Sequence, residues 1–166
     1  MGIQINAYGP LRPYAGPLDR HGDPVDDDGD HLPDVIRISP NRKAVAARGK
    51  GYEAGLYEAD QAFYAYLASY TEHARFAEKL ARFLGLASLH AALRQERLYH
   101  LFAMVSEPEG FVGPAEAARL SDGMQEHLSR LIDYAIRHDD LGFVGDFLSL
   151  YKGCRIAAEG GVLVLR

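Results

Sequence analysis

The sequence predicts a single α+β domain. Its sheet is mostly antiparallel or mixed and combines N-terminal segments with a C-terminal strand, packed against three to four helices. Three observations support this: period-two alternation near the start, helical periodicity from about residue 71 to 158, and an apolar run before the end. The chain has 166 residues, 48% hydrophobic and 25% charged, a size and balance typical of one globular domain. We therefore treat residues 1–166 as one domain.

Four segments are expected to form strands. In residues 2–8 the side chains of Ile3, Ile5 and Ala7 share one face, which indicates a strand with one buried side. Residues 35–38 form a short candidate that Pro40 ends. Residues 63–70 are rich in aromatic side chains, which favours a strand, with a helix over 58–68 as the alternative. Residues 162–165 are apolar throughout, which predicts a central strand.

The middle of the chain has helical periodicity. Apolar residues at steps of three and four predict a helix from Thr71 that Gly85 closes, followed by a short helix over 89–96. Residues 98–105 fit either a strand or a helix. A long helix is expected over about 115–137 and a last one over about 140–158.

Residues 9–34 are rich in Gly, Pro and Asp and predict a long irregular insertion. Four aspartates occupy relative positions 1, 3, 5 and 9, at which calcium loops present oxygen ligands: Asp26, Asp28, Asp30 and Asp34. The sixth position is His31 instead of glycine, and the twelfth is Arg37 instead of an acid. A solvated acidic loop is therefore favoured over calcium binding, and no other cofactor is expected.

Charge and cysteine content restrict the partner classes. The net charge of −5 argues against general binding to a nucleic-acid backbone, and the basic residues between 37 and 50 are interpreted as a solvated loop. The single cysteine, Cys154, allows no internal disulfide and is interpreted as a packing residue. With no signal-peptide pattern and no apolar stretch of membrane-spanning length, we expect a cytoplasmic protein with no membrane partner.

The most distinctive polar stretch is residues 106–114. It carries a hydroxyl, two carboxylates, two prolines and two glycines between apolar runs. Ser106, Glu107 and Glu109 could bind a cation or a basic partner, or act in acid–base catalysis. In the alternative interpretation these side chains only cap the helix that follows Pro114.

The order of several motifs over residues 51–166 resembles a family of small uncharacterised bacterial and phage proteins. That family has S-Y…R-[WF]-x-x-x-L-A, S-D-C-E-G-x-[IV]-G-P and C-terminal G-G-V motifs, with no assigned activity. The matching elements here are residues 55–57, 67–73, Arg75 with Phe76, Leu80 with Ala81, 106–114 and 160–162. The cysteine of the second motif is Pro108, which argues against thiol chemistry there.

The resemblance pairs two polar elements that each follow an apolar, strand-like run. If those runs are neighbouring strands, both elements emerge at one edge of the sheet. The binding site implied in this way comprises Ser69, Tyr70, His73, Arg75, Ser106, Glu107, Glu109 and Gly110.

The favoured function is a non-enzymatic protein-interaction module of a bacterial or phage accessory system. One concrete version is an immunity-type protein whose acidic insertion neutralises a basic toxin. The alternative is a hydrolase with Glu107 or Glu109 as general base and Ser69, Tyr70 or His73 nearby. Calcium binding through the acidic insertion is the third hypothesis.

Overall fold

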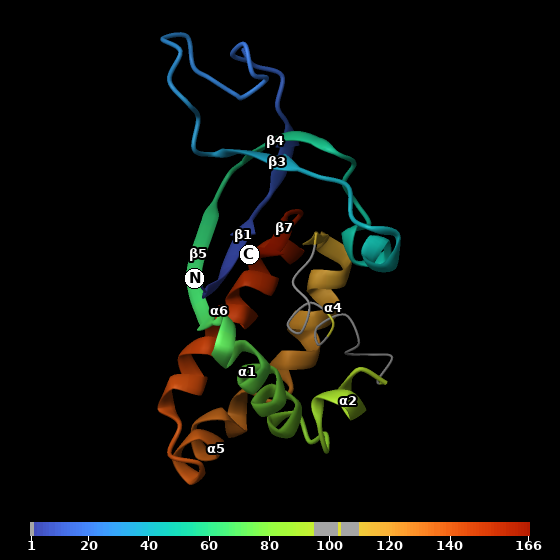
Figure 1. The fold of residues 1–166 in the computed structure, drawn as a ribbon, viewed down its shortest axis with the longest axis vertical. Helices are drawn as coiled ribbons and strands as arrows, with labels where there is room; N and C mark the ends of the chain where they lie inside the picture. The colour runs from blue at the N-terminus through green and yellow to red at the C-terminus, as the bar shows by residue number, and fades with distance from the viewer. Residues whose placement is uncertain (1, 95–102, 104–109) are drawn as a thin grey trace.

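The protein folds as a single α+β domain, which confirms the predicted class (Figure 1). The computed structural model describes residues 2–94, 103 and 110–166. Its strands are β1 Gly2–Tyr8, β2 Leu11–Pro13, β3 Val35–Ile38, β4 Gly55–Ala59, β5 Ala62–Ser69, β6 Phe111–Val112 and β7 Val162–Leu165. Its helices are α1 Tyr70–Phe83, α2 Leu89–Ala92, α4 Pro114–Gln125, α5 Leu131–Arg137 and α6 Leu141–Ala158, with 3₁₀ turns η1 Lys43–Gly49 and η2 Leu128–Arg130.

The strands form two antiparallel sheets, whereas the sequence predicted one. The four-stranded sheet has the order β5-β1-β7-β6, and the three-stranded sheet has the order β2-β4-β3. The inner position of β7 confirms the prediction of a central C-terminal strand. Tyrosine-rich β5 is paired with β1 along its whole length, so the alternative helix over 58–68 is wrong.

A two-stranded ribbon connects the sheets. The junction between β1 and β2 lies beside the junction between β4 and β5, and the backbone hydrogen bonds between the two segments continue through both junctions. The Gly9 amide donates to the Gln61 carbonyl at 3.1 Å, and the Asp60 amide donates to the Pro10 carbonyl at 3.1 Å. Because the backbone hydrogen bonds continue across the bend, the second sheet is an extension of the first.

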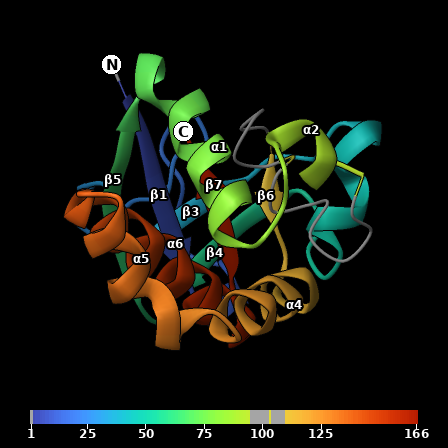
Figure 2. The same ribbon diagram turned by 90° about the horizontal axis from the view of Figure 1, so that it is seen from below.

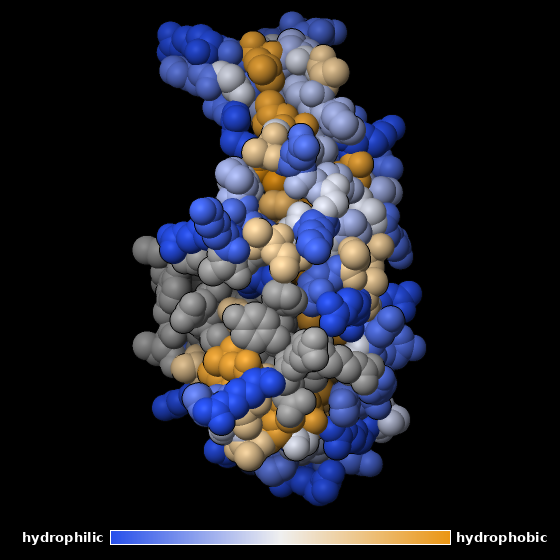
Figure 3. Space-filling view, turned by 90° about the vertical axis from the view of Figure 1, so that its right-hand side faces the viewer, coloured by the Kyte–Doolittle hydropathy of each residue, from blue (hydrophilic) through white to orange (hydrophobic). Residues whose placement is uncertain are grey.

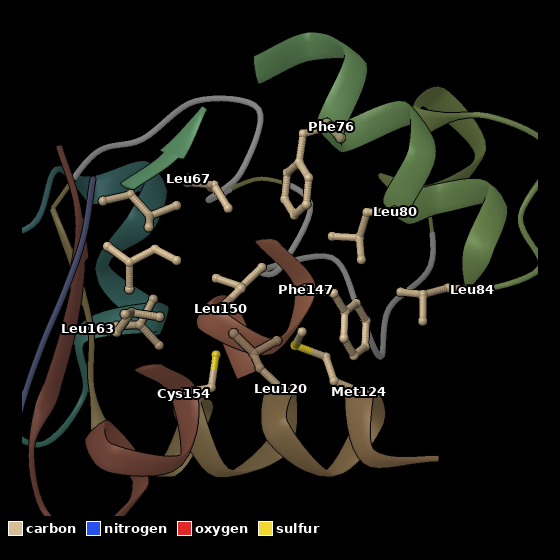
Figure 4. Packing of buried hydrophobic residues seen from close by; sticks show 14 of the residues in the cluster. Leu67, Phe76, Leu80, Leu84, Leu120, Met124, Phe147, Leu150, Cys154 and Leu163 are labelled. Carbon is tan, nitrogen blue, oxygen red and sulfur yellow. The ribbon is translucent and has the colours of Figure 1, made fainter. Parts of the chain in front are cut away.

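The main core lies between the four-stranded sheet and the helices. Ile3, Ile5 and Ala7 are fully buried on the face of β1 that meets α6, as the alternating pattern predicts. Figure 4 shows Phe76 and Leu80 of α1, with Leu84 just after this helix, on one side of α6 and Leu120 and Met124 of α4 on the other. Helix α6 therefore packs against the sheet, α1 and α4, and keeps one exposed face that includes Gly145, Leu148 and Lys152.

Part of the opposite face of β1, around Asn6 and Tyr8, is also covered, which the alternating pattern did not predict. Asn6 is 5% exposed and Tyr8 is 7% exposed. A second apolar cluster fills the space beneath the bend between the sheets and comprises Tyr8, Leu11, Ile38, Ala59, Phe111 and Val162. The ribbon folds this second layer over the sheet, so part of the face expected to be polar is buried.

The segment predicted as one helix over about 115–137 is two helices, so this prediction is wrong. It is interrupted after Gln125 by η2 and resumes as α5. Arg130 donates to the carbonyl of Phe83 at 2.5 Å, and Leu131 beside it is 2% exposed. The interruption turns α5 so that it packs against α6. The apolar spacing continues through the turn, which is why the sequence pattern indicated one helix.

Helices α1 and α6 agree with their predicted positions, whereas α2 begins at Leu89 as predicted and ends at Ala92, because residues 93–94 form a turn. The run at 98–105 lies outside those residues except for Ala103, which has helical backbone. The insertion predicted to be irregular over 9–34 contains β2. We call residues 14–34, which follow β2, the acidic arm. It stands clear of the helices at the far end of the three-stranded sheet (Figure 1).

We predict that Gly161→Ala strongly destabilises the protein. A Cβ atom there would lie 1.8 Å from the Tyr8 carbonyl oxygen and 2.6 Å from the Gly9 Cα atom. Because both are backbone atoms, the junction must move, and we expect a loss of about 2 kcal/mol or more in the free energy of unfolding, measured in urea.

The matched control is Gly145→Ala in the middle of α6, where a Cβ atom would meet nothing within 4 Å. Alanine is the better helix former, so this variant should gain about 0.5–1 kcal/mol. Equal effects of the two substitutions would contradict the close backbone packing at Gly161.

Candidate functional site

The structure separates the two polar elements that the sequence placed together. Ser69 ends β5 and Tyr70 begins α1, which also carries His73 and Arg75, while Gly110 directly precedes β6. Strands β5 and β6 are the two edges of the four-stranded sheet, with β1 and β7 between them (Figure 2). The two elements therefore flank opposite edge strands. Ser106, Glu107 and Glu109 lie outside the described residues.

Gly110 has a specific structural role. Its φ of 63° lies in the left-handed region that glycine adopts without penalty, and a Cβ atom there would overlap the Asn41 side chain. Asn41 pairs with the next residue: its Oδ1 accepts from the Phe111 amide at 2.7 Å and its Nδ2 donates to the Phe111 carbonyl at 2.9 Å. The glycine thus lets an amide side chain dock against β6.

A groove of about 230 Å³ runs beside Gly110 between β3, β6 and β7. Its lining is mostly apolar, with Ile36, Ile38, Phe111, Val162 and Val164 among its residues. The charged side chains among the described lining residues are Arg37 and Arg166. Among the described lining residues none is an aspartate or a glutamate, so the described part of this groove does not contain the carboxylate base that the sequence analysis expected.

A cavity with several charged lining residues lies elsewhere, between β5, α1 and the first turns of α6. It has a volume of about 310 Å³, and we call it the Asp146 pocket. Of the site residues expected from the sequence, Arg75 lines it. Its other lining residues are Tyr66, Leu67, Glu72, Phe76, Lys79, Asp140, Gly142, Phe143 and Asp146.

Two aspartates of this pocket have different environments. Lys79 Nζ lies 2.5 Å from Asp140 Oδ2, and Asp140 Oδ1 also accepts from the Phe143 amide at 3.3 Å as the N-cap of α6. Burial raises the pKa of Asp146 to about 6, supported by the nearby negative charges of Asp140 and Glu72 and opposed by Lys79. Asp146 therefore titrates close to neutrality.

Sequence reasoning missed Asp146, because it looks like an ordinary polar residue of an amphipathic helix. Its spacing from Asp140 is six residues, and no motif surrounds it. Lys79, which also affects its charge, comes from a different helix more than 60 residues earlier. Only the packing of α1 against the start of α6 brings these groups together.

Cys154 is fully buried, as its interpretation as a packing residue expects. Burial raises the pKa of its thiol to about 12, and the nearby Glu116 adds to this effect. The thiolate is the reactive form of cysteine, so Cys154 is not an activated nucleophile at neutral pH.

The acidic arm consists of two turns of the same form. Asp19 Oδ1 accepts from the amides of His21 at 2.8 Å and Asp23 at 2.9 Å. Asp26 Oδ1 accepts from the amides of Asp28 at 3.0 Å and Asp30 at 2.9 Å. The shared pattern Asp-x-x-Gly-Asp, at 19–23 and 26–30, was visible in the sequence but was interpreted there as one irregular insertion.

The calcium hypothesis stays a prediction. The Asp26 carboxylate already accepts two backbone amides, and Asp28, Asp30 and Asp34 do not converge on it to form a cluster. Within residues 2–94, 103 and 110–166, no group of three or more His, Cys, Asp or Glu side chains could hold a metal ion.

We predict that Asp146→Asn stabilises the protein at neutral pH. The pKa of Asp146 rises from its ordinary value of 3.8 to about 6 on folding, so the folded state binds the proton more tightly. Stability should therefore fall as pH rises between these two values, and asparagine, which cannot ionise, should escape the loss. The gain in the free energy of unfolding has an upper bound of about 3 kcal/mol, set by the size of the pKa shift. Because Asp146 is half-buried, solvent screening reduces the expected gain to about 1 kcal/mol.

Urea unfolding at about pH 4 and about pH 7.5 tests this. The stability difference between Asp146→Asn and the unaltered protein should increase toward the higher pH. The exposed Asp133→Asn on α5 serves as the control and should show no such increase. A difference for Asp146→Asn that is the same at both pH values would refute the shifted pKa.

Comparisons with known proteins identify no relative: no family model, curated protein or solved structure matches the chain. The family resemblance suggested by its motifs therefore stays a prediction. Of the helices in the described ranges, none combines the length and apolar composition that a membrane span needs.

Proposed function

We propose that this protein is a protein-interaction module that captures a basic partner through its acidic arm. The observation that carries the proposal is the segregation of charge. The arm contains seven aspartates and one arginine, a net charge of −6, whereas the whole chain carries −5 with histidines neutral. The remaining residues therefore carry +1, so the excess negative charge is confined to 21 residues.

The shape of the arm supports the same proposal. Figure 3 shows a mostly hydrophilic projection with a strip of hydrophobic residues, standing above the body of the protein. A charged projection reaches a partner before the rest of the surface does, and complementary charge accelerates encounter. This geometry favours recognition of a basic protein surface.

The arm is also held in one conformation by hydrogen bonds. Besides the two aspartate turns, the Tyr14 hydroxyl donates toward the carbonyls of Pro17 at 3.0 Å and Val25 at 3.1 Å. Arg37 of β3 donates to the Gly22 carbonyl at 2.6 Å and lies 3.3 Å from Asp23 Oδ1. A surface ordered before binding loses less conformational entropy when the partner arrives.

The accessory-system setting remains part of this proposal. In its immunity-type version, the partner is a basic toxin whose cationic surface the arm covers. The alternative hydrolase relies on Glu107 and Glu109, which lie outside the described residues, so no described contact favours it.

The test uses an arm variant that removes charge but keeps the turns. Asp27, Asp28, Asp30 and Asp34 are exposed, and their side chains do not accept the turn hydrogen bonds made by Asp19 and Asp26. Replacing these four aspartates with asparagine should abolish capture of the specific partner in affinity purification from the native host. The affinity of the unaltered protein for that partner should fall at least about tenfold between about 50 mM and about 500 mM salt.

The matched control removes the same number of charges from exposed positions on the body, with Glu53→Gln, Asp122→Asn, Asp133→Asn and Asp139→Asn. It should retain the partner. Equal capture by both variants, or an affinity that does not change with salt, would show that the arm is not the binding surface.

A further inference from the structure

The Asp146 pocket lies on the body of the protein and is independent of the acidic arm. Tyr66, Leu67, Phe76 and Phe143 supply apolar and aromatic lining, and the volume of about 310 Å³ is at the small end for ligand sites in proteins. The charged lining comprises Glu72, Arg75, Lys79, Asp140 and Asp146. A small polar head on an apolar stem would match both kinds of lining.

One carboxylate of the pocket, that of Asp146, stands apart from its ion pairs and hydrogen bonds. Lys79 is already engaged by Asp140, which in turn caps α6. Asp146 is half-buried and makes no hydrogen bond or ion pair with the described residues. A carboxylate withdrawn from water without a partner is stabilised when a cation is placed beside it.

We propose that the Asp146 pocket binds an organic cation, an ammonium or guanidinium group on a short apolar stem, with Asp146 as its counter-ion. Tyr66, which is 60% exposed, provides an aromatic ring face of the kind that attracts a cation, and the edges of the buried Phe76 and Phe143 provide apolar surface for the stem. An anion would meet three carboxylates against two basic side chains, and the ion pair of Lys79 with Asp140 removes one charge of each sign. The charge balance of the lining therefore selects a positive ligand.

This site has a characteristic dependence on pH. The groups facing Asp146 are Asp140 and Glu72, which raise its pKa, and Lys79, which lowers it, with Arg75 also on the lining. With a pKa of about 6, Asp146 is about one-tenth ionised at pH 5. Since the cation binds the ionised form, its affinity should be about tenfold weaker at pH 5 than at pH 7.5.

The experiment titrates the intact protein with two probes, 1,5-diaminopentane and Nα-acetyl-lysine methylamide, followed by NMR shifts of the pocket residues. At least one probe should bind saturably at about pH 7.5 and about tenfold more weakly at about pH 5. Preference for the lysine derivative identifies the natural ligand as a basic side chain of a protein. Preference for the diamine identifies it as a small free amine.

Three variants complete the test. Asp146→Asn should abolish binding of the probes, whereas Asp133→Asn should leave it unchanged. Lys79→Met removes the internal cation and should strengthen binding, because Asp140 then also becomes available. The proposal is overturned if neither probe saturates below about 10 mM at neutral pH, if binding survives Asp146→Asn, or if acetate or phosphate occupies the pocket instead. Because the acidic arm is intact in all of these proteins, the outcome is separate from that of the partner-capture experiment.

Discussion

The continuous pairing of two chain segments across a bend determines where everything else in this protein lies. Strands β1 and β2 run alongside β5 and β4, and the amides of Gly9 and Asp60 keep the ladder intact at the junction. Close contact between Gly9 and Gly161 brings the end of α6 and the start of β7 against the same point. The ribbon thereby ties the main core to the second sheet.

The two candidate sites lie at opposite ends of this ribbon. At one end, the connection from β2 to β3 is the acidic arm, which therefore extends away from the helices. At the other end, β5 leads directly into α1, and α1 meets the start of α6 to form the Asp146 pocket. In our two proposals aspartate serves different purposes: exposed carboxylates in the arm would attract a basic partner at long range, and the half-buried Asp146 would be a single counter-ion.

The sequence predicted those parts of the fold that depend on local periodicity. Alternation in residues 2–8 identified β1, the apolar end of the chain identified β7, and helical spacing identified α1 and α6. The break at η2 was not predictable, because Leu128 and Leu131 keep a helical spacing through it while the long-range bond from Arg130 to Phe83 fixes the turn. The second sheet was missed because its existence depends on pairing between segments about 45 residues apart.

The same limit applies to the sites. The acidic insertion was identified because its composition is local, although the repeated Asp-x-x-Gly-Asp turns within it were not. The Asp146 pocket was not predictable, since Lys79 and Asp146 come from helices far apart in the sequence. The sequence analysis placed Ser69–Arg75 and Gly110 in one site on the assumption that the strands before them are neighbours. In the structure, β5 and β6 are the two opposite edges of the four-stranded sheet.

We propose that a partner docks on the acidic arm. Amide hydrogen exchange of the protein with and without its captured partner tests this claim directly. We expect the protection from amide exchange that is gained on binding to be concentrated in residues 14–34 and in Arg37 beside them. Protection confined to the helices, with exchange in the arm unchanged, would contradict it.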